Sequence, residues 1–139
     1  MAQLSLWIVR KRTNGSVEEN RRHAEHVRRL WRMAKKDRLH LWRFLRPRFT
    51  NLVKLALGGD ADCVCPLDDE ELGVLFVGGG QEPLKGLREL FLYRMGSLTD
   101  SGFGALTHAG CGKNLTWLSL SCAHRFPSTV AILILMGSC

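Results

Sequence analysis

Two close pairs of residues have side chains suited to metal chemistry. His23 and His26 are three residues apart, and Cys63 and Cys65 are separated by one valine. The histidine pair has no further ligands at a suitable spacing. The cysteine pair could bind a soft metal with the distant Cys111 and Cys122, but these two occupy positions of a repeated pattern that favour burial as small apolar residues. Gly78 to Gly80 lack the lysine and the spacing of a phosphate-binding loop and fit a turn better. The sequence therefore predicts no metal, no cofactor and no catalytic residue, and we expect a protein that is not an enzyme.

The basic residues are concentrated in one part of the chain. The net charge of +7 arises in residues 10–48, which hold 14 Lys and Arg against 4 Asp and Glu, whereas residues 49–139 hold 6 against 9. Such a region is most often a solvated helix face and less often a surface for an acidic or polyanionic partner.

The apolar stretches are short, and the cysteines lack a disulfide pattern. Leu4 to Val9 is shorter than the apolar core of a secretion signal, about 7–15 residues. Val130 to Met136 is far shorter than the roughly 20 apolar residues that span a membrane. Five cysteines without regular spacing indicate reduced thiols. We therefore expect an intracellular protein, cytoplasmic or nuclear, without a transmembrane segment.

A short leucine pattern occurs three times. Leu87 to Leu92 matches Leu115 to Leu120, which begins 28 residues later, and Leu52 to Leu57 is a third copy, 35 residues earlier. Alternate leucines of each copy would lie on one face of a short strand. The extra residues of the longer interval fall around Gly58 to Cys65 and Gln81 to Gly86, where loops tolerate insertions.

A second pattern follows the first two copies. Leu67 to Leu75 aligns with Leu98 to Leu106, with apolar residues at the first, sixth and ninth places. The final spacing of three predicts a short helix, and Asp68 and Thr99 are suitable N-caps for it. One strand and one helix cannot bury their own leucines, so neighbouring units must stack.

The combined pattern resembles the leucine-rich repeat family, in the cysteine-containing subtype of many F-box proteins. Leu87 to Cys122 carries most of the resemblance, and Leu52 to Leu84 is a looser copy. Leu98 to Asp100 match the element before the helix, Cys111 the cysteine before the next strand, and Cys122 lies one residue before the usual strand-following cysteine. The resemblance implies an α/β fold, a short solenoid with parallel strands on the concave side, short helices outside and an N-terminal helical cap.

Side chains between the strand leucines are expected on the concave face. The alternation predicts columns of neighbouring residues across the sheet: Lys54, Glu89 and Trp117; Ala56, Phe91 and Ser119; Gly58, Tyr93 and Ser121. Three aromatic side chains on one exposed sheet would form a binding hot spot. The candidate contacts for a protein partner are Lys54, Glu89, Phe91, Tyr93, Trp117 and Ser119. Alternatively, the C-terminal apolar run or a neighbouring protomer covers this face.

Residues before the repeats are expected to form one or two helices. Apolar residues recur at helical spacing from Val27 to Leu45. Ser16 and Glu19 give a capping-box signal at the start, and Pro47 ends the helical pattern. The apolar face would cap the first repeat. The opposite face carries eight basic residues: Arg21, Arg22, Arg28, Arg29, Arg32, Lys35, Lys36 and Arg43.

The same region resembles part of an F-box. Val27 to Arg32, Asp37, and Leu41 to Arg43 are similar to the second half of that motif, whereas its first half has no counterpart in Met1 to Asn20. The resemblance implies a Skp1-like adaptor as partner and a role as substrate receptor of a ubiquitin ligase. A further interpretation makes the basic face a nucleic-acid or anionic surface on a repeat scaffold, although no known nucleic-acid motif accompanies the charge.

These patterns divide the chain into three regions. Residues 1–48 are the basic helical region, residues 49–122 the leucine-rich repeats, and residues 123–139 an apolar tail or incomplete repeat. Within the tail, Val130 to Met136 is expected to form a last strand that covers the final repeat. The favoured function is a protein-binding module, and the alternative is a basic-helix polyanion binder.

Overall fold

The computed structural model describes residues 4–8, 16–49, 51–59, 63–77, 82–122 and 128–137. These residues form a mixed α/β fold in which every strand pairing is parallel. In chain order the elements are β1 (Leu4–Ile8), α1 (Val17–Arg32), α2 (Lys35–Leu45), the short 3-10 helix η1 (Arg46–Arg48), β2 (Leu52–Gly58), β3 (Cys65–Asp68), α3 (Asp69–Phe76), β4 (Glu89–Ser97), α4 (Asp100–His108), β5 (Trp117–Cys122) and α5 (Thr129–Gly137).

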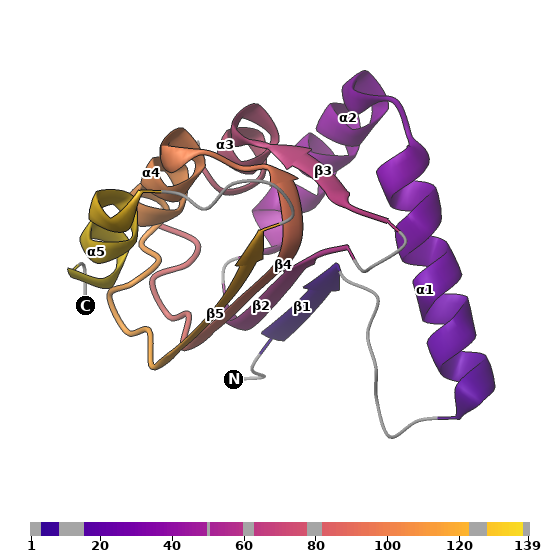
Figure 1. The fold of residues 1–139 in the computed structure, drawn as a ribbon, viewed down its shortest axis with the longest axis horizontal. Coiled ribbons are helices and arrows are strands. Elements are labelled where there is room, and N and C mark those ends of the chain that lie inside the picture. Colours follow the sequence, from indigo (N-terminus) through magenta and orange to yellow (C-terminus); the bar gives the residue numbers. More distant parts are fainter. Residues whose placement is uncertain are drawn as a thin grey trace.

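The sheet is open, and its main strands lie in chain order. β1 pairs with β2, β2 with β4, and β4 with β5, while β3 pairs with the second half of β4. The predicted strands at Leu52, Leu87 and Leu115 are therefore neighbours, as β2, β4 and β5. Strand β1 is not predicted from the sequence, because Leu4 to Val9 is compared only with the length of a secretion signal. Figure 1 shows helices α2, α3, α4 and α5 on one side of the sheet.

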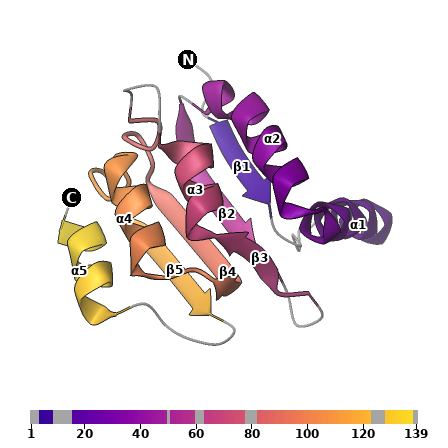
Figure 2. The same ribbon diagram turned by 90° about the horizontal axis from the view of Figure 1, so that it is seen from above.

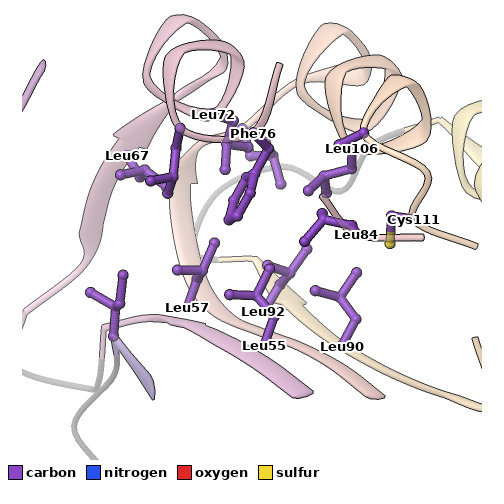
Figure 3. Close-up of a cluster of buried hydrophobic side chains, with 14 of the residues drawn as sticks. Leu55, Leu57, Leu67, Leu72, Phe76, Leu84, Leu90, Leu92, Leu106 and Cys111 are labelled. Carbon is purple, nitrogen blue, oxygen red and sulfur yellow. The ribbon is translucent and has the colours of Figure 1, made fainter. Parts of the chain in front are cut away.

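The strand leucines form the core, as the alternation predicts. Leu55 pairs with Leu90, and Leu57 with Leu92, and all four are fully buried. They meet apolar side chains from β3, α3, α4 and the turns that follow these helices (Figure 3), namely Leu67, Leu72, Phe76, Leu84, Leu106 and Cys111. Each fully buried leucine contributes about 1.5–3 kcal/mol through its transfer from water.

Helices α2, α3, α4 and α5 lie side by side in chain order over the sheet, and α1 lies beyond the β1 edge (Figure 2). The predicted caps start these helices. Ser16 Oγ accepts from the Glu19 N–H at 3.1 Å at the start of α1. Asp68 and Glu71 form a reciprocal capping box at α3, and Thr99 caps α4.

One hydrogen-bond arrangement joins successive helices twice. The Asp69 carboxylate, in the first turn of α3, accepts from the backbone N–H and the hydroxyl of Thr99. The Asp100 carboxylate, in the first turn of α4, accepts from the N–H and the hydroxyl of Ser128, both at 2.8 Å. Ser128 directly precedes α5 as Thr99 precedes α4, so the two arrangements occupy equivalent places. They fix the spacing between neighbouring helix starts.

The extra residues of the first interval interrupt a strand. Gly58 pairs with Tyr93, and Cys65 pairs with Met95. Six residues, 59–64, separate Gly58 from Cys65, whereas one residue separates Tyr93 from Met95 on β4. Gly58 has a φ of +148°, and a Cβ there would lie 2.0 Å from the Tyr93 carbonyl oxygen. Only glycine fits this close approach without strain. The chain therefore leaves the sheet after Gly58 and resumes it at Cys65.

The expectation of a last strand at Val130 to Met136 is wrong, because these residues lie in α5. Ser128 is held beside α4 by Asp100, and the following residues pack against α4 with Leu135 fully buried. An uncharged apolar run has no periodicity that separates a buried strand from a helix. Tertiary contact decides the outcome here.

Among the residues that the structure describes, no helix is both long and apolar enough to cross a membrane. The turn expected at Gly78 to Gly80 lies outside them.

Candidate partner-binding surface

The six candidate contact residues lie on the face of the sheet opposite the helices. Lys54 pairs with Glu89 and Glu89 with Trp117, so the first predicted column is present. Ala56 pairs with Phe91 and Phe91 with Ser119, which gives the second. In the third, Gly58 pairs with Tyr93, but the register between β4 and β5 shifts after Leu92, so the predicted pairing of Tyr93 with Ser121 is wrong. None of the described elements covers this face, and Figure 1 shows all four helices of the row on the other side.

The aromatic side chains of this face lie close together. The ring centroids of Phe91 and Tyr93 are 6.0 Å apart at an interplanar angle of 33°. Lys54 Nζ lies 5.2 Å from the centroid of Phe91 and 4.0 Å from a Glu89 carboxylate oxygen. A cation above a ring is attracted by the negative face of the π system. The lysine is thereby held over Phe91 beside the acid.

Exposure varies along this face. Trp117 is 58% exposed, whereas Lys54, Glu89, Phe91, Tyr93 and Ser119 are half-buried. Ala56 is fully buried despite its place in the second column. The face thus offers one protruding indole and two half-buried rings with a lysine and a glutamate beside them. Such a surface can bury apolar side chains of a ligand and offers polar groups at its margin.

The eight predicted basic residues divide into three groups. Arg21 and Arg22 bind Glu18, Arg21 also binds Glu25, and Lys35 binds Asp68 and Glu70 in α3. The hydrogen bond from Arg21 lowers the pKa of Glu18, and the hydrogen bond to Asp68 raises the pKa of Lys35. Arg28 is half-buried. The remaining exposed cations are Arg29, Arg32, Lys36 and Arg43.

Arg43 borders an open groove on the helix side of the fold. The groove has a volume of about 760 Å³ and lies between α2, α3 and α4. Glycines at equivalent places of two helices, Gly73 and Gly104, form part of its wall, with no atom within 4 Å of where a Cβ would lie. The two glycines leave space for the groove, because neither has a side chain that would fill it.

One buried charged cluster was not predicted. Arg38 in α2 donates from Nε and Nη2 to the two carboxylate oxygens of Glu71 in α3, at 2.6 and 3.2 Å. Arg38 is 5% exposed and Glu71 is fully buried. Trp42 Nε1 and the Asp68 N–H also donate to Glu71, and Arg38 Nη1 donates to the Met33 carbonyl oxygen, at the end of α1. The cluster therefore connects α1, α2 and α3.

The sequence held a signal for this cluster. Arg38 lies seven residues after Trp31 and four before Trp42, on the apolar side of the helical pattern. A charged residue at such a position is buried only with a partner of opposite charge. The sequence pattern alone could not identify Glu71 as that partner.

The histidines and cysteines do not gather into a site. Cys63, Cys65 and Cys111 are free thiols, and burial raises the pKa of Cys65 to about 12. Within the described ranges, no three His, Cys, Asp or Glu side chains lie close enough to hold a metal ion. His23 is half-buried and His26 is exposed on α1.

Comparison with models of known protein families, with curated proteins and with solved structures finds no match to this chain.

Proposed function

We propose that this chain is a protein-binding module, built as a short leucine-rich-repeat solenoid, that holds a protein partner on the sheet face of Lys54, Glu89, Phe91, Tyr93, Trp117 and Ser119. The observation that carries the proposal is the lateral register of β2, β4 and β5, which places equivalent residues of the repeated pattern beside one another. The equivalent bonds from Asp69 to Thr99 and from Asp100 to Ser128 also support repeated units.

The chemistry of the face indicates the kind of partner. Tyrosine and tryptophan are enriched among the residues that dominate binding energy at protein interfaces. Trp117 protrudes from the face, whereas the rings of Phe91 and Tyr93 are half-buried in it. A partner segment with an apolar or aromatic side chain would pack between them, and Lys54 and Glu89 would meet polar groups at the margin of that contact.

Site-specific photo-crosslinking would test this surface. A photoreactive phenylalanine analogue at position 117 should capture a defined partner from cell extract. The matched control carries the analogue at position 44, because Phe44 is also an exposed aromatic residue, at 63%, but lies on α2. The same partner should bind the unlabelled protein, and Phe91→Ala/Trp117→Ala should weaken that binding by at least tenfold. Equal binding by the double variant and the wild type would contradict the proposal.

The F-box resemblance leads to a narrower proposal, in which the partner is a Skp1-like adaptor. Val27, Trp31 and Trp42, three residues of that resemblance, are buried, and Trp31 Nε1 donates to the Gly58 carbonyl oxygen at 3.0 Å. These contacts favour a capping role for α1 and α2. An adaptor would have to use their exposed residues, and binding of purified adaptor to the intact chain tests this directly.

The second candidate function is binding of a polyanion by the basic helices. The exposed Arg29, Arg32 and Lys36, close together where α1 ends and α2 begins, favour it. Neutralising phosphate contacts releases counterions, so the affinity for a duplex oligonucleotide should fall steeply with salt. The triple alanine variant of these residues should flatten that dependence. Salt-independent affinity would exclude this function.

We also propose that the protein works in a reducing compartment, cytoplasmic or nuclear. Cys65 and Cys111 are buried free thiols, and a small domain with this much apolar core does not need disulfides.

A further inference from the structure

The end of the sheet at β5 is incompletely covered. Leu90 and Leu92 of β4 are fully buried, with β5 and its leucines beside them. Leu118 and Leu120, their partners on β5, are only half-buried. Among the described strands β5 pairs with β4 alone, so its other backbone edge lies open. Strand β5 covers the edge and the leucines of β4, whereas no described strand covers β5 in the same way.

Helix α5 extends this exposed end. Its residues Val130 and Ile134 line a small groove toward α4, and Leu135 is fully buried. Val130, Leu133 and Met136 follow one another at a spacing of three, so they lie along one side of α5, away from the buried Leu135. They are 64%, 59% and 49% exposed. Figures 1 and 2 show α5 and β5 at the same end of the fold, and we call the exposed side of α5 together with the open edge of β5 the end face.

The described residues of this end face carry no charged side chain. Residues 114–122 and 128–137 contain no Asp, Glu, Lys or Arg, in a chain whose net charge is +7. Two copies of so basic a chain repel each other over most approaches. In a contact related by a two-fold axis, both copies contribute the same surface patch. A charged side chain near the axis would therefore face an identical charge on the other copy. An uncharged face avoids that repulsion.

The opposite end of the sheet is different. Helix α1, which carries exposed arginines, lies beyond β1 (Figure 2). A head-to-tail contact between β5 and β1 of another copy would bring that charged helix to the contact. A two-fold contact at β5 does not.

We propose that this end face is the interface of a homodimer, in which β5 pairs antiparallel with β5 of a second copy and α5 packs against its counterpart. A two-fold axis perpendicular to the sheet brings the two edge strands together and keeps both α5 helices on the same side. In this dimer the second copy covers the edge of β5 and the exposed side of α5, as β5 and α5 cover β4 and α4 within the chain.

Sedimentation velocity of the intact chain over a wide range of concentrations tests the dimer. The wild type should sediment as a species of twice the 15.7 kDa chain mass. Leu133→Glu should shift it to the monomer, because loss of a buried leucine from each copy corresponds to at least about a hundredfold weaker association. The matched control, Phe44→Glu, places the same charge at a comparably exposed apolar residue of α2, away from this end face, and should remain dimeric.

Each contrary result is informative. A monomeric wild type with native circular dichroism would overturn the proposal, as would a dimer that Leu133→Glu leaves intact. A ladder of larger species would indicate head-to-tail association and would also contradict a two-fold contact. Amide hydrogen exchange of the wild type adds a measurement that needs no variant. Protection of residues 117–122 should rise with protein concentration, and concentration-independent protection would contradict the strand pairing.

Discussion

Replacing Arg38 by methionine should strongly destabilise the fold, although the change preserves most of the side-chain volume. Arg38 is the cation that faces the fully buried Glu71 carboxylate, with two hydrogen bonds of 2.6 and 3.2 Å. Methionine leaves this carboxylate with two neutral donors, from Trp42 and the Asp68 backbone. It also removes the donor that binds the Met33 carbonyl oxygen at the end of α1.

The magnitude follows from removal of one partner of a buried ion pair, which costs about 3–5 kcal/mol because the other charge stays buried. A domain of this kind has a total free energy of unfolding of about 5–15 kcal/mol. The variant should therefore lose a large share of its stability. The helices α1, α2 and α3 should loosen first, since the cluster joins them.

Urea unfolding followed by tryptophan fluorescence measures this loss, because Trp31 and Trp42 are buried near the cluster. The matched control is Arg43→Met, the same substitution on the exposed side of α2, which should change stability by less than about 0.5 kcal/mol. Glu71→Gln completes a double-mutant cycle with Arg38→Met, and the combined loss should fall short of the sum by at least about 0.5 kcal/mol. A loss below about 1 kcal/mol for Arg38→Met, or strict additivity, would refute the buried ion pair.

Three further predictions concern other parts of the fold. Asp100→Ala removes the acceptor for Ser128 and should speed amide exchange in α5 but not in α3; equal effects on both helices would contradict the local role. Gly58→Ala should lower the urea midpoint clearly, because a Cβ would lie 2.0 Å from a carbonyl oxygen of β4; an unchanged midpoint would show that the strand can shift. Partial burial, the largest single effect, raises the pKa of Asp68, but the hydrogen bonds from Lys35 and the Glu71 N–H and the charges of Lys35 and Arg38 together hold that pKa below its usual 3.8. The stability from this carboxylate is present above that value and is lost as the pH falls through the lower folded pKa. Asp68→Asn should therefore flatten the acid side of a plot of urea midpoint against pH, and an unchanged slope would contradict the ion pair.

The sequence predicted the strands with regular leucines and the helices with clear caps. Alternation at Leu90 and Leu92 has a period of two, which only a strand converts into one buried face. Thr99 and Asp68 offer side-chain acceptors to the first N–H groups of a helix, which need such partners wherever the helix lies. These signals are local. The candidate contact residues followed from the same alternation, and their lateral register is as predicted.

Tertiary contacts decided what the local signals left open. The segment from Val130 to Met136 would present apolar residues on every face, whether it formed a strand or a helix. In the structure it is helical and packs against α4. Leu4 to Ile8 became a strand because β2 offers it an edge 48 residues along the chain. Arg38 became a buried ion pair because the fold brings Glu71 to it from another helix. Sequence periodicity fixes which face of an element is apolar, whereas packing between distant segments decides what that face meets.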